Sequence, residues 1–314
     1  MIVTVTFNPS VDRALEVDQL VRGEVLRAGG SRIDPGGKGV NVSRALLANG
    51  VHTRAIMPAG GAEGDQLVAL LGAEGVDTIA VPITGRTRSN ITLAEPDGTV
   101  TKVNEPGPEM SAVEFAQVSD VVLAAARPGE WVVICGSLPP GPTLPAFERL
   151  CVRLIDSGAR LAVDSSGAAL LSGVRTGAAL VKPNREELAE AIGAELHSLG
   201  DVVEACRELR AAGAGAVLAS LGADGAVLVD ETGVLTGVSP VSAPRSTVGA
   251  GDALLAGFLA AGARGEKALA EGLAWGAAAV SLPGSRMPGP ADLNRTDIVI
   301  DRRLDLVRPL LTRG

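Results

Sequence analysis

The sequence contains no tyrosine, and aromatic residues make up only 2 % of its 314 residues. Side chains on which nucleic-acid bases could stack are therefore scarce. The formal net charge is −8 at pH 7, so the chain has no excess of cations to displace the counterions of a nucleic acid or an anionic membrane. We expect neither as a partner, and an anionic small substrate would need a few cations placed close to it.

Cysteines and long apolar runs are also scarce. The three cysteines are unevenly spaced and form no CxxC pair, so the sequence indicates neither a disulfide framework nor a zinc site. Cys135 ends an apolar run and is expected to be a buried structural thiol. No stretch reaches about 18 uninterrupted apolar residues, and residues 1–9 do not resemble a secretory signal. The sequence predicts a soluble, cytoplasmic protein.

Hydrophobic residues are abundant, at 46 %, and can fill the core of one large α/β domain over residues 1–314. Short apolar runs alternate with helical patterns, which predicts a mostly parallel sheet with helices on both faces. The expected strands are 2–7, 51–57, 76–81, 132–135, 161–164, 179–181, 216–220 and 226–229, and the expected helices are 40–48, 64–71, 111–126, 144–157, 185–192, 201–212, 250–263 and 267–280.

Two segments interrupt this alternation. Residues 84–105 read as a β-hairpin around the turn Pro96-Asp97-Gly98, and residues 11–33 carry further short strand signals. The two segments could pair into a small antiparallel sheet apart from the main body. We expect this sheet to act as a lid inserted in the α/β core.

The common nucleotide-binding loops are missing. The first predicted strand is followed by Asn-Pro-Ser at residues 8–10 rather than GxGxxG, and no complete copy of that motif follows any other predicted strand. Residues 249–254 begin the pattern but have Leu254 at its last position. A phosphate-binding P-loop is excluded as well, because Gly39 follows Lys38 where Ser or Thr is required.

A different phosphate-binding device is indicated at residues 246–252. Small residues at the start of a predicted helix leave its first N–H groups uncovered, and with the helix dipole these can bind an anion. Gly249, Ala250 and Gly251 would supply this anion site. Asp252 would take the proton of an acceptor hydroxyl during phosphoryl transfer. The alternative is that Asp252 caps the helix and the glycines form a tight turn.

Two further motifs could bind ligands. At residues 36–41, glycines such as Gly37 let the backbone approach a ligand, while Lys38 and Asn41 offer a charge and an amide to sugar hydroxyls. This stretch could equally be a loop that enters a helix. Asn184 and Glu187 suit a hydrated Mg²⁺, bound directly or through water, or alternatively form a helix N-cap box.

Taken in order, these motifs resemble the PfkB/ribokinase family of carbohydrate kinases. The family signatures are Gly-Gly-Lys-Gly-Val-Asn at residues 36–41 and Thr-Val-Gly-Ala-Gly-Asp at 247–252, and the resemblance extends from residue 6 to 284. It implies a ribokinase-like three-layer α/β core with a β-sheet lid, ATP as co-substrate, Mg²⁺, and a homodimer paired through the lids.

The resemblance also implies roles for single residues. Asp252 would be the catalytic base, with the amides of residues 249–251 as the anion hole. Sugar-binding positions match Asp12, Lys38 and Asn41. The positions that match the nucleotide and magnesium region are Lys182, Asn184, Glu187, Ser220, Gly222, Gly225 and Thr247.

Several stretches, at 8–12, 87–90, 95–99, 104–108 and 136–141, resemble the branch of the family that phosphorylates sugar phosphates. Arg88, with Arg27 and Lys38, could hold the substrate's phosphate through charge-assisted hydrogen bonds, and Asn90 and Ser137 are further candidates for substrate binding. The expected substrate is a ketohexose phosphate, preferably fructose 1-phosphate, with fructose 6-phosphate and tagatose 6-phosphate as alternatives. A non-catalytic sugar-phosphate sensor is the alternative of another class.

Overall fold

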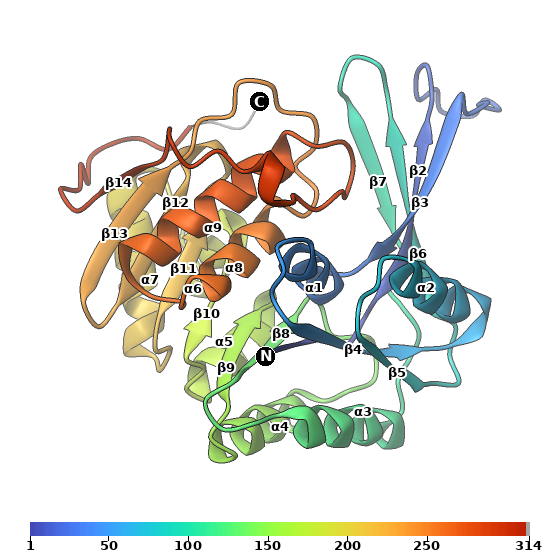
Figure 1. Ribbon diagram of the computed structural model, residues 1–314, viewed down its shortest axis with the longest axis horizontal. Coiled ribbons are helices and arrows are strands. Elements are labelled where there is room, and N and C mark those ends of the chain that lie inside the picture. Colours follow the sequence, from blue (N-terminus) through green and yellow to red (C-terminus); the bar gives the residue numbers. More distant parts are fainter. Residues whose placement is uncertain (312–314) are drawn as a thin grey trace.

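The computed structural model describes residues 1–311, in which ten strands form one large sheet (Figure 1). From one edge to the other they are β14 (Val299–Asp301), β13 (Gly233–Val238), β12 (Ala226–Asp230), β11 (Val217–Ser220), β10 (Leu180–Val181), β9 (Arg160–Asp164), β8 (Trp131–Cys135), β1 (Ile2–Thr6), β4 (Thr53–Ala59) and β5 (Thr78–Pro82). The strands from β11 to β5 are all parallel, whereas β12, β13 and β14 pair antiparallel.

Helices cover both faces of the sheet, which confirms the predicted α/β class (Figure 1). One hydrophobic core lies between the sheet and the helices α3 to α7, and a second lies between the sheet and α1, α8 and α9. The helices are α1 (Lys38–Ala48), α2 (Gly61–Ala73), α3 (Ala112–Ala125), α4 (Leu144–Asp156), α5 (Gly167–Arg175), α6 (Arg185–Ile192), α7 (Leu199–Ala211), α8 (Ala250–Ala260) and α9 (Gly265–Val280).

Strand β8 shows why such strands read as continuous apolar runs. Successive side chains of a strand point to opposite faces, and here both faces are covered. Val132 and Ile134 belong to the core beneath α3 to α7, while Trp131, Val133 and Cys135 belong to the other core. Cys135 is 1 % exposed, which confirms the prediction of a buried thiol.

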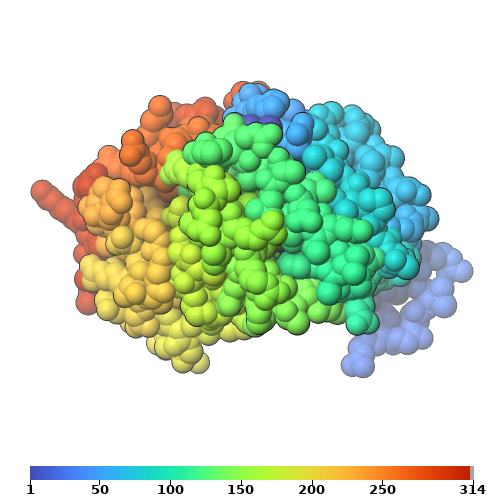
Figure 2. Space-filling view, turned by 90° about the horizontal axis from the view of Figure 1, so that it is seen from below, coloured from blue at the N-terminus to red at the C-terminus, as the bar shows by residue number. Residues whose placement is uncertain are grey.

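A second, four-stranded sheet stands apart from the large one. Its order is β3 (Gly30–Gly36), β2 (Ser10–Glu16), β6 (Arg88–Ala94) and β7 (Val100–Asn104), so both interrupting segments contribute strands to it. Pairing is antiparallel except between β2 and β6. The strands extend away from the large sheet (Figure 1), and the loop between β2 and β3, drawn in blue, projects from the body (Figure 2).

Three elements were absent from the prediction. Helix α5 is short and contains Gly167 and Gly173, and β13 contains Gly233 and Gly237, so neither carries a strong periodic pattern. Strand β14 has only three residues and depends on pairing with β13. Within residues 1–311, none of the helices has the length and apolarity needed to cross a bilayer.

Candidate active site

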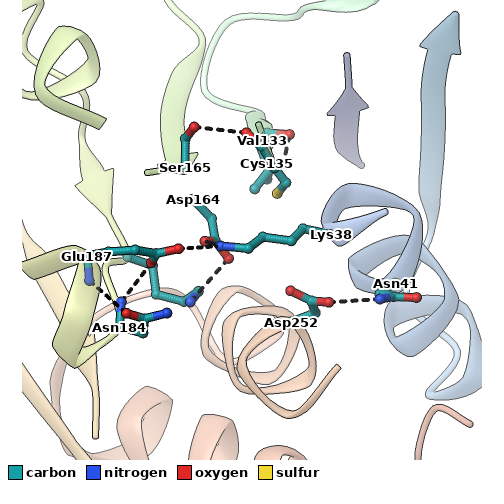
Figure 3. Close-up of polar contacts among 11 residues, drawn as sticks. Lys38, Asn41, Val133, Cys135, Asp164, Ser165, Asn184, Glu187 and Asp252 are labelled. Carbon is teal, nitrogen blue, oxygen red and sulfur yellow. Dashed lines mark hydrogen bonds and ion pairs between the residues drawn. The ribbon is translucent and has the colours of Figure 1, made fainter. Parts of the chain in front are cut away.

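Parallel strands end at the same edge of a sheet, and ligands of such folds bind where the strand order reverses. The reversal occurs here at β1, which lies between β4 and β8. Asp164 ends β9, Lys182 follows β10, and Ser220 ends β11, so these side chains gather at that edge. Lys38 and Asn41 reach the same edge from the start of α1, and Asp252 reaches it from the start of α8 (Figure 3).

Four charged side chains form a connected cluster. The Lys38 Nζ donates to Asp164 Oδ1 at 2.8 Å and to Glu187 Oε1 at 2.9 Å. The Lys182 Nζ lies 3.1 Å from Asp164 Oδ2. Asp164 is fully buried and Lys182 is 3 % exposed, so the carboxylate neutralises two cations in a dry environment.

Charge pairing outweighs desolvation in this cluster. Burial alone would raise the pKa of Asp164, but the adjacent Lys182 and Lys38 hold it below its ordinary value. Burial would likewise lower the pKa of Lys38, but the charges of Asp164 and Glu187 raise it. Asp164 and Lys38 are therefore both ionised at neutral pH. Lys38, itself a predicted sugar-binding residue, contacts Glu187 of the predicted nucleotide region.

The start of α8 has the features of an anion site. Gly249 has a φ of 75°, a left-handed conformation that favours glycine, and no side chain caps the helix. Within residues 1–311 no acceptor is found for the N–H groups of Gly251 and Asp252. A Cβ built on Gly251 would lie 3.4 Å from Lys182 Nζ, so the ammonium group is adjacent to these free N–H groups.

Asp252 does not cap α8, contrary to the alternative interpretation. Its Oδ2 accepts a hydrogen bond from Asn41 Nδ2 at 2.9 Å, across the gap between α8 and α1 (Figure 3). The side chain is buried, with 6 % of the residue exposed. Burial, together with the charge of Asp164, raises the pKa of Asp252 to about 6, whereas Lys38 and the Asn41 hydrogen bond act in the opposite direction.

Asn184 and Glu187 form the N-cap box of α6. The Asn184 side chain accepts from the Glu187 N–H at 2.8 Å, and Glu187 Oε2 accepts from the Asn184 N–H at 2.8 Å. The other Glu187 oxygen accepts from Lys38, so both carboxylate oxygens already have donors. Among residues 1–311 no group of three or more His, Cys, Asp or Glu side chains could hold a metal ion. The contacts of Asn184 and Glu187 are those of the N-cap box that the sequence offered as the alternative to a magnesium site.

The predicted sugar-binding residues of the small sheet lie side by side. Asp12 on β2 is in register with Asn90 on β6, and its Oδ1 accepts from Asn90 Nδ2 at 2.9 Å and from Ser10 Oγ at 2.7 Å. A side chain at Gly36 would overlap the Asp12 carboxylate, so the glycine leaves room for the carboxylate in its present position.

Arg88 lies at the base of the small sheet. Its Nη1 donates to the Glu105 carbonyl and its Nη2 to the Asn8 carbonyl, both at 2.9 Å. The Asn8 side chain donates in turn to Ser137 Oγ at 3.2 Å, which brings Arg88 and Ser137 to one place. Arg27 is exposed in the loop between β2 and β3, and no contact joins it to this group within residues 1–311.

The predicted nucleotide segment follows β11. Ser220 pairs with Asn184 in an isolated bridge, and residues Gly222–Asp224 form a 3₁₀ turn that ends at Gly225, whose φ is 87°. Asp224 holds this turn to a distant part of the chain: its Oδ1 accepts from Arg308 Nη1 and its Oδ2 from the Leu311 N–H, both at 2.8 Å. Thr247 lies exposed just before the turn that begins α8.

Sequence reasoning did not select two residues that organise the site. Asp164 is a carboxylate at the end of an apolar strand, a position from which it could have been suspected. Asn8 follows β1 and contacts Ser137 and the Pro106 carbonyl, the latter at 3.0 Å. Neither partner of Asn8 is near it in sequence, so the available signals were its place after a strand and its membership of the resembling stretch 8–12.

A buried carboxylate beside free helix N–H groups and two ammonium groups suits phosphoryl transfer, because that reaction needs a proton acceptor next to a site for a highly charged anion. Residues 5–292 match the model of the pfkB family carbohydrate kinases. The chain belongs to this family and is a phosphotransferase with ATP as the family's co-substrate.

Individual relatives agree with this assignment. The chain is 38 % identical over 267 residues to the 1-phosphofructokinase of Rhodobacter capsulatus, covering 84 % of each protein. It is 36 % identical over 307 residues to the ATP-dependent 6-phosphofructokinase isozyme 2 of Escherichia coli, covering 96 % of this chain and 99 % of the relative. A crystal structure of Escherichia coli phosphofructokinase-2 with substrates and products superposes with a TM-score of 0.88 at 37 % identity, covering 93 % of this chain and 96 % of that one.

Proposed function

We propose that this protein transfers the γ-phosphoryl group of ATP to a hydroxyl of a ketohexose phosphate, with fructose 1-phosphate as the preferred acceptor and fructose 1,6-bisphosphate as the product. The observation that carries the proposal is Asp252: its carboxylate is buried, its pKa is raised to about 6, and it lies one residue beyond the free N–H of Gly251. A base with a pKa near the working pH is well suited to take up a proton in the transition state.

The proposed step can be followed atom by atom. The acceptor hydroxyl gives its proton to an Asp252 carboxylate oxygen, its oxygen forms a bond to the γ-phosphorus, and the bond from that phosphorus to the bridging oxygen of ADP breaks. The N–H groups at the start of α8 and the ammonium of Lys182 stabilise the charge on the transferring group. Mg²⁺, when bound through water by Asn184 and Glu187, would neutralise charge on the ATP phosphates.

The choice of sugar rests on the small sheet and on the relatives. Arg88 and Ser137 meet at Asn8, and Asp12 pairs with Asn90. These four residues would bind the phosphorylated ketose. Several relatives are named 1-phosphofructokinase, at 38 % and 37 % identity, which favours fructose 1-phosphate. Others at 36 % and 35 % are named 6-phosphofructokinase isozyme 2, so fructose 6-phosphate is the second candidate.

A panel of acceptors tests the proposal. The purified protein is expected to consume ATP with fructose 1-phosphate in the presence of Mg²⁺, with a larger kcat/KM than with fructose 6-phosphate or tagatose 6-phosphate. Removal of Mg²⁺ by a chelator should abolish turnover, and unphosphorylated fructose serves as the control acceptor. Binding of a sugar phosphate without ATP consumption would instead identify a sensor.

Arg88→Ala is expected to raise the KM for the sugar phosphate about 10- to 100-fold, because a charge-assisted hydrogen bond contributes about 1.5–3 kcal/mol. The KM for ATP should change little. Arg153→Ala is the matched control, since Arg153 is 61 % exposed and pairs only loosely with Asp120 at the surface, 3.7 Å away. An unchanged sugar-phosphate KM in Arg88→Ala would show that another residue holds the phosphate.

We also propose that the protein acts in the cytoplasm and forms a homodimer. The two copies would pair through the small sheet. Ile91 on β6 and its cross-strand neighbour Val103 on β7 are 38 % and 56 % exposed. A second copy would cover these apolar side chains. A relative's structure is described as a tetrameric inhibited form, so assembly occurs in the family. Sedimentation compares the molecular mass of Val103→Lys with that of the unaltered protein. A dimer that becomes a monomer in Val103→Lys would identify this surface as the interface.

A further inference from the structure

Asn41 connects the candidate base to a second buried side chain. Asn41 and Arg44 lie one turn apart on α1, and Arg44 Nη1 donates to Asn41 Oδ1 at 3.3 Å. The other end of the same amide, Nδ2, donates to Asp252 Oδ2. Asn41 is 6 % exposed and Arg44 is 7 % exposed, so the connected chain from Arg44 to Asp252 is buried throughout.

Arg44 is itself held rigidly from two sides. Its Nε and Nη2 donate to the two carboxylate oxygens of Glu74 at 2.7 and 2.8 Å, a bidentate pair with the residue that caps the end of α2. Its Nη1 also donates to the Ser285 carbonyl at 3.1 Å. The planar guanidinium group is therefore fixed by Glu74 and by the Ser285 carbonyl, and one of its N–H groups is aimed at Asn41.

The chemistry of the three groups allows one orientation of the amide. A guanidinium group can only donate hydrogen bonds, and an ionised carboxylate can only accept them. If the Asn41 amide were turned by 180°, its NH₂ would face the donor of Arg44 and its oxygen would face the Asp252 carboxylate. Both contacts would be repulsive, whereas the observed orientation satisfies both.

We propose that Arg44 is a positioning residue for the candidate base: by fixing the Asn41 amide, it keeps an N–H donor on the Asp252 carboxylate. The inference rests on the proposed function, because it concerns the same base. Arg44 itself touches neither Asp252 nor any group of the predicted substrate sites other than Asn41, so its effect reaches the base only through that amide.

The consequence is a change in the protonation of Asp252. The Asn41 hydrogen bond stabilises the ionised carboxylate and so opposes the rise in pKa caused by burial and by Asp164. Lys38 on α1 and Lys182 after β10 also face the carboxylate, and Cys135 on β8 is a further titratable neighbour. From α9, the buried residues are apolar or glycine. None of the hydrogen bonds and ion pairs that hold Lys38 and Lys182 involves Arg44.

Arg44→Gln is expected to shift the acidic limb of the kcat–pH profile to higher pH. The glutamine side chain can accept as well as donate, so the Asn41 amide is no longer held and its donor is lost to Asp252 for part of the time. We expect kcat to fall about tenfold at pH 6, the effect of one charged hydrogen bond, and to recover towards the unaltered protein at pH 8. The KM for ATP should not change.

Two further variants keep the test decisive. Arg54→Gln is the matched control, because Arg54 also pairs with an acidic residue, Asp77, at 2.8 Å, but on the surface away from the site; its pH profile should match that of the unaltered protein. Glu74→Gln weakens the hold on Arg44 from a partly exposed position and should move the same limb in the same direction by less. If thermal melting shows that Arg44→Gln is unfolded, the pH profile of Glu74→Gln takes its place as the test.

The outcomes separate this inference from the proposed function. A folded Arg44→Gln whose kcat is reduced by one factor at every pH would overturn the positioning role, as would an unshifted limb in Glu74→Gln and Arg44→Gln together. In either case Asp252→Asn would still be inactive. If Asp252→Asn retains turnover, the proposed base is wrong, and the proposed function fails before Arg44 is considered.

Discussion

Asp252→Asn is expected to lower kcat about 10²- to 10⁴-fold, the usual contribution of a general base. Asparagine has the same shape and its Oδ1 can still accept the hydrogen bond from Asn41, so the pocket should keep its geometry. Binding of the sugar phosphate, measured by calorimetry, should therefore change little. Asp65→Asn is the control, since Asp65 is an exposed acidic residue near the start of α2. Turnover within a few-fold of the unaltered protein would disprove the assignment.

The same substitution should make the protein more stable near neutral pH. The pKa of Asp252 is raised above that of an unfolded chain, so the folded state holds its proton more tightly and loses stability as pH rises from about 4 through about 6. Asparagine carries no charge and removes this cost, which we estimate at roughly 1–3 kcal/mol. A variant that is less active but melts at a higher temperature at pH 7, and not at pH 4, would show that the site holds its charge at the expense of stability.

Asp164→Asn is expected to destabilise the fold by about 3–5 kcal/mol, because breaking a buried ion pair leaves an uncompensated charge. Lys38 would keep Glu187 as a partner, but Lys182, 3 % exposed, would lose its carboxylate. The pKa of Asp164 is lowered in the folded state, so its contribution is present above the pKa of the unfolded carboxyl group, near 4, and is lost as pH falls. Urea unfolding of the variant and of the unaltered protein measures the difference in the free energy of unfolding. This difference should be present at pH 7 and smaller at pH 3.

The control for this prediction is Asp77→Asn, which breaks the surface pair with Arg54. An exposed ion pair contributes less than about 1 kcal/mol. If Asp164→Asn cost no more stability than this control, the cluster would not depend on the Asp164 charge.

Asp164→Asn should also change the pH dependence of activity, since the charge of Asp164 raises the pKa of Asp252. Any residual activity should therefore have its acidic limb at lower pH.

Local chemistry made parts of the site predictable from sequence. The glycines before Asp252 and the polar residues at 36–41 indicate unusual backbone, and the Asn184 and Glu187 spacing is that of an N-cap box, which the structure contains. What could not be predicted is pairing across the chain. Lys38 lies 126 residues from Asp164 and 149 from Glu187, and no local pattern records either contact.

In the fold, too, some elements could be predicted from local sequence and others could not. The parallel strands were visible as apolar runs because both their faces are buried. Strand β14 and helix α5 were not visible in the sequence. Strand β14 has only three residues, and α5 has nine that include two glycines, so neither shows a clear hydrophobic period. That Asp252 does not cap its own helix also needed the structure, because its carboxylate instead accepts a hydrogen bond from Asn41 on another helix.

The contact between Asp224 and residues 308 and 311 has a consequence for how the protein is made. Asp12, Arg88 and Ser137, which form the proposed sugar side, all lie within the first 137 residues. The turn at Gly222–Asp224 is fastened only when Arg308 and the Leu311 N–H reach it. Because chains are synthesised from the N-terminus, these two contacts can form only after residue 311 has been made. The nucleotide turn therefore takes its final anchorage later than any of the contacts within residues 1–137.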